Sequence, residues 1–182
     1  MKKLILILFL LVPMLSMAQE AKFMGLELGT DMDSFCNSLL KKGLKQTVDR
    51  FSEREFIGTF ATYNNCSIII KCTETSKKVM SAEVVVESVR NNKYKRDKAF
   101  DEILEQYKCK YGDKVIKYTD ENDKKFLSLI GYQVECGDIK IKISKFGPHF
   151  LSPNECSLSI YYISKSLINN KEINTEKYSD DI

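Results

Sequence analysis

Several kinds of functional residue are scarce or missing in this chain of 182 residues. Histidine occurs once, at His149, and no two cysteines have the Cys-x-x-Cys spacing that zinc sites use. There is also no glycine-rich phosphate loop and no Gly-x-Ser-x-Gly nucleophile motif. These absences argue against zinc binding, nucleotide hydrolysis and serine-hydrolase chemistry. We expect neither a metal nor any other cofactor.

No apolar run in the chain is long enough to span a bilayer, and the most apolar stretch lies at the start. Lys2-Lys3 precede an apolar stretch at residues 4–12 and the small-residue segment 16–18. This order is typical of a cleavable signal peptide, and the stretch is about half the length of a membrane span. We therefore predict that residues 1–18 are removed and that the chain is exported, to the periplasm or outside the cell. An uncleaved anchor is the alternative.

The charge of the chain does not indicate a nucleic-acid partner. The formal net charge is +3, and loss of Lys2 and Lys3 lowers it to +1. Proteins that bind nucleic acids usually carry a clear excess of basic residues. The remaining 164 residues have the length of a single domain.

Two amphipathic helices are predicted. The first begins near Thr30 and Asp33, which have the spacing of a capping box, and ends at Gly43. Residues at helical spacing form its apolar face: Met32, Phe35, Cys36, Leu39 and Leu40. The second helix ends at Gly112, and its apolar face has the same spacing: Phe100, Ile103, Leu104, Tyr107 and Tyr111.

Segments with alternating apolar residues follow each helix and predict β-hairpins. In the first hairpin we predict a two-residue turn at Asn64-Asn65, which places Ile57 and Ile68 on one face. In the second hairpin the turn falls at Gly137-Asp138, which pairs Cys136 with Ile139, Val134 with Ile141 and Tyr132 with Ile143. The two predicted turns coincide at an offset of 73 residues, and the same offset brings Gly58 onto Gly131.

We predict an α+β fold of two tandem repeats, each made of one helix followed by an antiparallel β-meander of about four strands. The repeats span about residues 23–89 and 96–163 of one domain at 19–163, joined by a linker at 88–97. Residues 164–182 lose the apolar alternation and are predicted to be a mobile or weakly helical polar tail. Chance likeness between two amphipathic hairpins is the alternative to a duplication.

The segment FMGLELGTDMDSFCNSLLKKGLK, followed by GTFATYNNC, resembles the start of a group of small secreted Bacteroidota proteins of uncharacterised function. The shared features are a signal peptide, an FMG-type stretch, an LGT-type helix cap and a helix that ends at glycine. The predicted tandem architecture is similar to that of β-lactamase inhibitory protein and its relatives, a likeness that transfers no residue roles. It implies a protein that binds another protein with the open face of its sheet.

Six cysteines in an exported chain raise the question of disulfide bonds. Two of them lie on one predicted strand about 20 Å apart, too far to form a bond with each other: Cys66 and Cys72. Cys136 is predicted at the opposite end of its meander from Cys156. Four cysteines are therefore either small core residues or disulfide partners: Cys36, Cys66, Cys72 and Cys156. Cys109 is predicted on the outer side of its helix, where it could pair with a loop, pair with another chain or remain a free thiol.

The predicted sheet face opposite the helices is the main candidate for a binding surface. It carries Phe60, Ile69 and Lys71, and an exposed Phe60 and Ile69 would form an apolar contact patch. Burial of both between the repeats is the alternative. A second candidate is a basic run that is either an anion- or partner-binding loop or a solvated linker: Arg90, Lys93, Lys95 and Arg96.

The sequence favours a non-catalytic module that binds a protein or peptide partner in the cell envelope or outside the cell. An envelope enzyme that uses the His149 loop is one alternative. A catalytic histidine needs a nucleophile and an orienting acid, and no motif in this sequence supplies them. A purely structural component of the envelope is the other alternative. The sequence does not indicate an oligomeric state.

Overall fold

The computed structural model describes residues 21–118, 129–146 and 156–169. The predicted signal peptide, His149 and residues 170–182 lie outside the described residues, and the turn of helix at 165–169 is the described part of the predicted tail. The elements follow one another as α2 (Met32–Lys41), β1 (Lys45–Asp49), β2 (Glu53–Phe60), β3 (Tyr63–Cys72), β4 (Val79–Val86), η1 (Glu87–Val89), α3 (Lys93–Tyr111), η2 (Gly112–Lys114), β5 (Ile116–Tyr118), β6 (Leu129–Cys136), β7 (Ile139–Phe146) and β8 (Ser157–Ser164).

The eight strands that the structure describes belong to one antiparallel sheet, in the order β1-β2-β3-β4-β8-β7-β6-β5. The last of these strands along the sequence lies near the middle of the sheet, where β8 pairs with β4 on one side and with β7 on the other. The prediction of two tandem helix-plus-meander repeats is therefore wrong. The strands form a single continuous sheet, and the fold is richer in β-structure than two such repeats. Alternating apolar residues predict that a strand exists but not which strand it pairs with, so the β4–β8 pairing was not foreseen.

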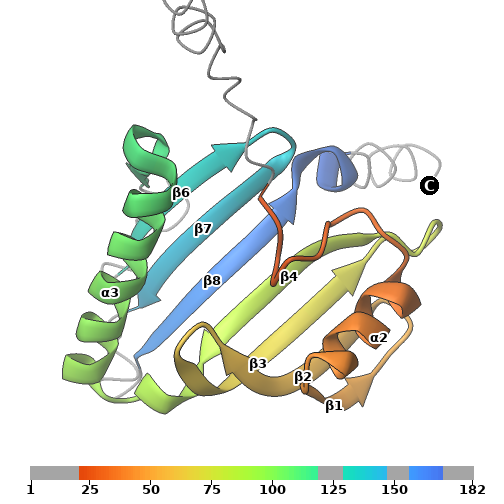
Figure 1. Ribbon diagram of the computed structural model, residues 1–182, viewed down its shortest axis with the longest axis horizontal. Helices are drawn as coiled ribbons and strands as arrows, with labels where there is room; N and C mark the ends of the chain where they lie inside the picture. Colours follow the sequence, from red (N-terminus) through yellow and green to blue (C-terminus); the bar gives the residue numbers. More distant parts are fainter. Residues whose placement is uncertain (1–20, 119–128, 147–155, 170–182) are drawn as a thin grey trace, which may run out of the picture.

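Helices α2 and α3 lie on the same face of the sheet, and residues 21–29 run between them (Figure 1). Phe23 in this segment is fully buried, stacks on Phe35 of α2 and Phe60 of β2, and meets Tyr162 of β8 edge-on. The hydrophobic core therefore lies between one face of the sheet and a layer formed by the helices and the N-terminal segment. We call this side of the sheet the helix side and the other side the open face.

The first helix differs from its prediction at its N-cap and at one residue of its apolar face. Asp31, not Thr30, caps α2, because its carboxylate accepts a hydrogen bond from the Ser34 backbone N–H at 3.0 Å. Leu40, predicted on the apolar face, is 42% exposed, whereas the other four predicted residues of that face are buried. Gly43 follows the helix with a φ of +89°, which agrees with its predicted place beyond the helix end.

The second hairpin is confirmed. β6 and β7 are joined at Gly137-Asp138, and all three predicted pairs are present: Cys136 with Ile139, Val134 with Ile141 and Tyr132 with Ile143. Gly137 has a φ of +58°, in the left-handed region that two-residue hairpin turns use. The turn signal in the sequence and the observed turn therefore coincide.

The first hairpin turns earlier than predicted. The β2–β3 turn lies at Ala61-Thr62, so Phe60 pairs with Tyr63, and the register then shifts so that Gly58 pairs with Cys66. Successive residues of a strand face opposite sides of the sheet. Because the observed register differs from the predicted one by an odd number of residues, each side chain of β2 lies on the face opposite to its prediction. Phe60 consequently lies on the helix side. Ile57, predicted on the same core face as Ile68, lies on the open face and is 43% exposed.

Candidate functional site

The two apolar residues predicted to form one patch lie on opposite sides of the sheet. Phe60 is 8% exposed and its ring centre lies 5.9 Å from that of Phe23. Ile69 lies on the open face and is half-buried. Lys71 lies on the same face as Ile69, is exposed, and forms an ion pair with Glu53 at 3.2 Å. The predicted patch therefore keeps Ile69 and Lys71 but not Phe60.

The open face carries apolar residues besides Ile69 that the sequence did not indicate as candidates for a binding site. The pairing of β2, β3, β4 and β8 places four of them on this face: Ile57, Val85, Tyr161 and Ile163. Charged side chains lie on the same face, next to these residues along the strands or opposite them on the neighbouring strand. Among them are Glu55, Lys71, Glu83, Lys140 and Lys142. Helices α2 and α3 lie on the other side of the sheet (Figure 1). The arrangement is a mixed apolar and charged surface on paired strands.

At the β5 end, an aromatic side chain covers part of the open face. The Tyr118 ring lies over Gly131, where a Cβ atom would come within 2.3 Å of it. The Tyr118 hydroxyl and the Ser144 hydroxyl are hydrogen-bonded at 2.7 Å, and the Lys142 ammonium lies 5.0 Å from the ring centre. A side chain at position 131 would fit only if the Tyr118 ring moved aside. This end of the face is therefore closed by the protein itself.

The predicted basic run does not form a single cationic loop. α3 begins at Lys93, capped by the Asn92 side chain, so residues 93–97 are helical and not part of a linker. Lys93 and Lys95 are exposed, and Arg90 forms an ion pair with Glu87 at 3.0 Å. The run is therefore split between the segment before α3 and the first turn of the helix.

Arg96 is a structural residue instead of an anion-binding one. It is 4% exposed, donates to the backbone carbonyl of Phe146 on β7, and forms an ion pair with Asp97 at 2.7 Å. Lys145 lies 3.1 Å from the same carboxylate. Burial by itself would raise the pKa of Asp97, but its hydrogen bonds with Arg96 and Lys145 hold the pKa below its usual value. Arg96 thereby fastens the start of α3 to the end of β7.

The cysteines divide into one exposed thiol and five buried ones, and all six are free in the structure. Cys109 is exposed on α3, which confirms its predicted place on the outer side of the helix. The other five are buried: Cys36, Cys66, Cys72, Cys136 and Cys156. Burial raises the pKa of the Cys36, Cys66, Cys72 and Cys136 thiols, which disfavours the reactive thiolate.

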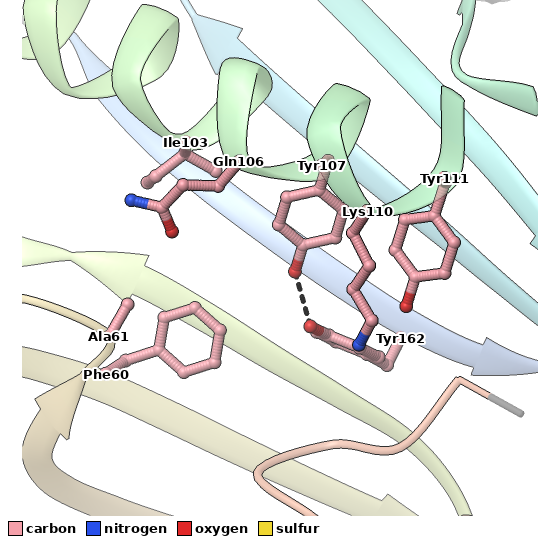
Figure 2. Close-up of a pocket in the computed structure, with 8 residues that line it drawn as sticks. All are labelled: Phe60, Ala61, Ile103, Gln106, Tyr107, Lys110, Tyr111 and Tyr162. Carbon is pink, nitrogen blue, oxygen red and sulfur yellow. Dashed lines mark hydrogen bonds between the residues drawn. The ribbon is translucent and has the colours of Figure 1, made fainter. Parts of the chain in front are cut away.

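The structure contains a pocket that the sequence analysis did not predict. It lies between the C-terminal half of α3, the β2–β3 turn and β8, and has a volume of about 200 Å³ (Figure 2). We call it the tyrosine pocket, and its lining consists of Phe60, Ala61, Ile103, Gln106, Tyr107, Lys110, Tyr111 and Tyr162. The spacing of Tyr107 and Tyr111 on one face of α3 was visible in the sequence, but their partners on β2 and β8 were not.

A pair of phenols is the main polar feature of the tyrosine pocket. The hydroxyls of Tyr107 and Tyr162 share one hydrogen bond, drawn in Figure 2. Burial raises the pKa of Tyr107 well above its usual value and that of Tyr162 to about 12. Both phenols therefore keep their protons at neutral pH. The two hydroxyl groups carry two hydrogens, and the bond between them uses only one. The other O–H can donate a hydrogen bond to a ligand.

Lys110 supplies the positive charge of the tyrosine pocket. Its side chain extends from α3 toward Tyr162, and its ammonium group lies 5.1 Å from the centre of the Tyr111 ring (Figure 2). None of the eight lining residues is acidic. The pocket therefore combines apolar walls with donors and a cation.

No cluster of three or more metal-ligating side chains is present in residues 21–118, 129–146 and 156–169. Within these ranges, no helix has the length and hydropathy needed to cross a membrane. The chain matches no protein-family model, no curated protein and no solved structure. The resemblance to small secreted Bacteroidota proteins therefore stays a prediction.

Proposed function

We propose that the chain is an exported, non-catalytic binding module that recognises a protein or peptide partner through the open face of its sheet. The observation that carries the proposal is the group of apolar side chains on that face, which neither α2 nor α3 covers. In soluble proteins, contiguous apolar residues at the surface often mark interaction sites.

The apolar positions lie in neighbouring rows across the strands and alternate there with polar residues. Ile69 of β3 and Tyr161 of β8 lie in one row on either side of Glu83, and Ile57 and Val85 lie in the adjacent row with Ser67 between them. Ile163 extends the group on β8. Strand pairing holds these side chains at fixed spacing, so binding would cost little ordering of the surface.

The charged side chains around this group give the surface a means of selecting its partner. Glu83 lies between Ile69 and Tyr161, while Lys142 follows Tyr161 in the same row on β7. A partner with apolar side chains and both signs of charge at matching positions would be favoured, because charge complementarity mainly gives specificity. Burial of Phe60 leaves the proposal dependent on Ile69 and its neighbours.

The test places a photo-reactive amino acid at position 69 in the full chain, expressed in its producing cells. A second chain carries the same group at position 40, because Leu40 is an exposed apolar residue (42%) of α2, which lies on the other side of the sheet. After illumination, the cross-linked protein and the cross-linked peptide are identified by mass spectrometry.

We expect one partner to be captured from position 69 and not from position 40, and expect Tyr161→Asp to abolish that capture. Capture of the same proteins from both positions would show non-specific contact. Absence of any product at position 69, with the chain correctly folded, would remove the open face as a binding surface.

A further inference from the structure

We propose that the tyrosine pocket is a binding site for a small carboxylic acid whose apolar body is about the size of one aromatic ring. The site lies on the helix side of the sheet and is separate from the open face. It therefore does not depend on the function proposed above.

The volume of the pocket limits the size of the ligand. A cavity of about 150 Å³ is known to hold one benzene molecule, and drug-sized ligands occupy about 300–1,000 Å³. At about 200 Å³, the tyrosine pocket is large enough for one ring or a short alkyl chain with a polar group. It is too small for a nucleotide or a steroid.

The walls favour an apolar body. Phe60 and Ile103 are buried, and the ring of Tyr162 forms a further wall (Figure 2). Ala61 at the β2–β3 turn adds little bulk at the edge. A ring or alkyl chain placed among these groups would lose water from the part of its apolar surface that contacts the walls, which is the main source of affinity for ligands of this size.

The polar groups favour an acid over a base or a neutral polar head. The Tyr107–Tyr162 pair has one O–H donor left over, whichever of the two hydroxyls donates to the other. Lys110 adds an ammonium group with further donors, and no lining residue is acidic. A carboxylate would accept from both groups, and hydrogen bonds between ionised partners are the stronger kind. A cationic ligand would instead be repelled by Lys110.

The first experiment is an NMR titration of the ¹⁵N-labelled full chain with benzoate, 3-phenylpropanoate and hexanoate. The amide of each acid serves as the neutral control of the same shape. We expect the backbone signals of Phe60, Tyr107 and Lys110 to shift, and each acid to bind about tenfold more tightly than its amide, because one charge-assisted contact is lost.

Matched variants locate the charge. Lys110→Met should weaken binding of the acids about tenfold and leave binding of the amides unchanged. Lys108→Met removes the same charge from the same helix, but Lys108 is exposed and forms an ion pair with Glu105 at 2.7 Å. This control should change neither affinity. Gln106→Phe, at an exposed position on the rim of the pocket, should block both ligands without disturbing the core.

Three results would overturn the proposal. The first is an absence of shifts at the lining residues with about 10 mM acid, a concentration above the dissociation constants expected of weak ligands. The second is equal affinity for an acid and its amide. The third is an equal loss of affinity in Lys108→Met and Lys110→Met.

Discussion

The β2–β3 hairpin and the β6–β7 hairpin each contain one glycine, and the two glycines face opposite sides of the sheet. Gly58 of β2 faces the helix side, where a Cβ atom would come within 2.8 Å of Leu44. Gly131 of β6 faces the open side, beneath the Tyr118 ring. The shift of register at the end of β2 causes the difference. The position of one turn thus decides which side chains meet the helices and which remain on the open face.

This difference also explains the tyrosine pocket. The earlier turn in the first hairpin carries Phe60 to the helix side, where it packs against Phe23 and lines the pocket with Tyr162. In the second hairpin, Cys136 ends its strand on the helix side as a small residue. The larger side chain in the first hairpin therefore provides the wall that faces α3.

The largest expected difference in stability is between substitutions at Phe60, on the helix side of the sheet, and at Ile69, on the open face. Phe60→Asp should lower the free energy of unfolding by about 3–5 kcal/mol, because it leaves a cavity and buries a polar group. Ile69→Asp should cost only about 1 kcal/mol, as at a half-exposed strand position. Urea denaturation of both variants measures the difference. Equal costs would mean that the sides assigned to these residues are wrong.

The next effect compares the buried and the exposed arginine of the basic run. Arg96→Met should cost about 2–3 kcal/mol, because Asp97 and the Phe146 carbonyl lose a buried partner. Arg90→Met should cost less than about 0.5 kcal/mol, because its ion pair with Glu87 is largely exposed. Thermal unfolding followed by circular dichroism is sufficient to test both. A similar small cost for both variants would contradict the structural role of Arg96.

The two glycines give a smaller effect. Gly58→Ala should cost about 1–3 kcal/mol, because its neighbour Leu44 is buried and cannot move freely. Gly131→Ala should cost about 1 kcal/mol, because the ring of Tyr118 is the end of a side chain and can rotate away. In a Tyr118→Ala background the cost of Gly131→Ala should largely disappear, which denaturation of the double variant would show. A cost that persists there would place the strain elsewhere.

The turn of the second hairpin should contribute a dependence on pH that the first hairpin lacks. Asp138 accepts from the Ser164 hydroxyl at 2.5 Å and from the Ser166 backbone N–H at 2.8 Å. Burial acts to raise the pKa of Asp138, but these hydrogen bonds lower it overall. A lowered pKa in the folded state stabilises the protein above the unfolded-state pKa of about 3.9, and this contribution is lost as the pH falls through the folded-state value.

Denaturation of the wild-type chain and of Asp138→Asn between pH 7 and about pH 2 tests this expectation. The variant should be less stable at pH 7, and the gap between the two proteins should narrow as the pH falls. A gap that is independent of pH would show that the carboxylate charge is unimportant there.

Chemical labelling of the cysteines is the test that should disturb the structure least. Cys109 is exposed and should react with a maleimide in seconds to minutes, whereas Cys136 is 9% exposed with a raised pKa and should react only after local opening. Mass spectrometry of the native protein should show one rapid modification, lost in Cys109→Ser. Rapid modification of a second cysteine would reveal an opening that the structure does not contain.

The sequence predicted local elements well where their signals were unambiguous. The second hairpin could be placed because Gly137 marks a turn that needs a positive φ. In the first hairpin the turn uses Ala61, with a φ of +52°, while Asn65, with a φ of +55°, lies inside β3. Asparagine tolerates that conformation better than alanine, so the sequence pointed to the wrong pair of residues.

The tyrosine pocket could not be predicted from the sequence because its parts come from distant segments. Phe60 ends β2, Lys110 belongs to α3, and Tyr162 belongs to β8. Only the register of the first hairpin and the pairing of β8 with β4 bring them together. Both depend on long-range packing. By contrast, the spacing of Phe100, Ile103 and Leu104 was enough to predict their burial, because one helix holds all three.

The central position of β8 has a consequence for how the molecule folds. Until residues 157–164 are synthesised, β4 has a free edge that carries Ala82 and Val84 on its apolar side, and β7 is paired only with β6. Free apolar edges promote aggregation, and pairing between distant segments slows folding. A chain truncated before β8 should therefore yield two unfinished half-sheets instead of one smaller stable protein. The final strand to be made is the one that joins the two halves into a single cooperative unit.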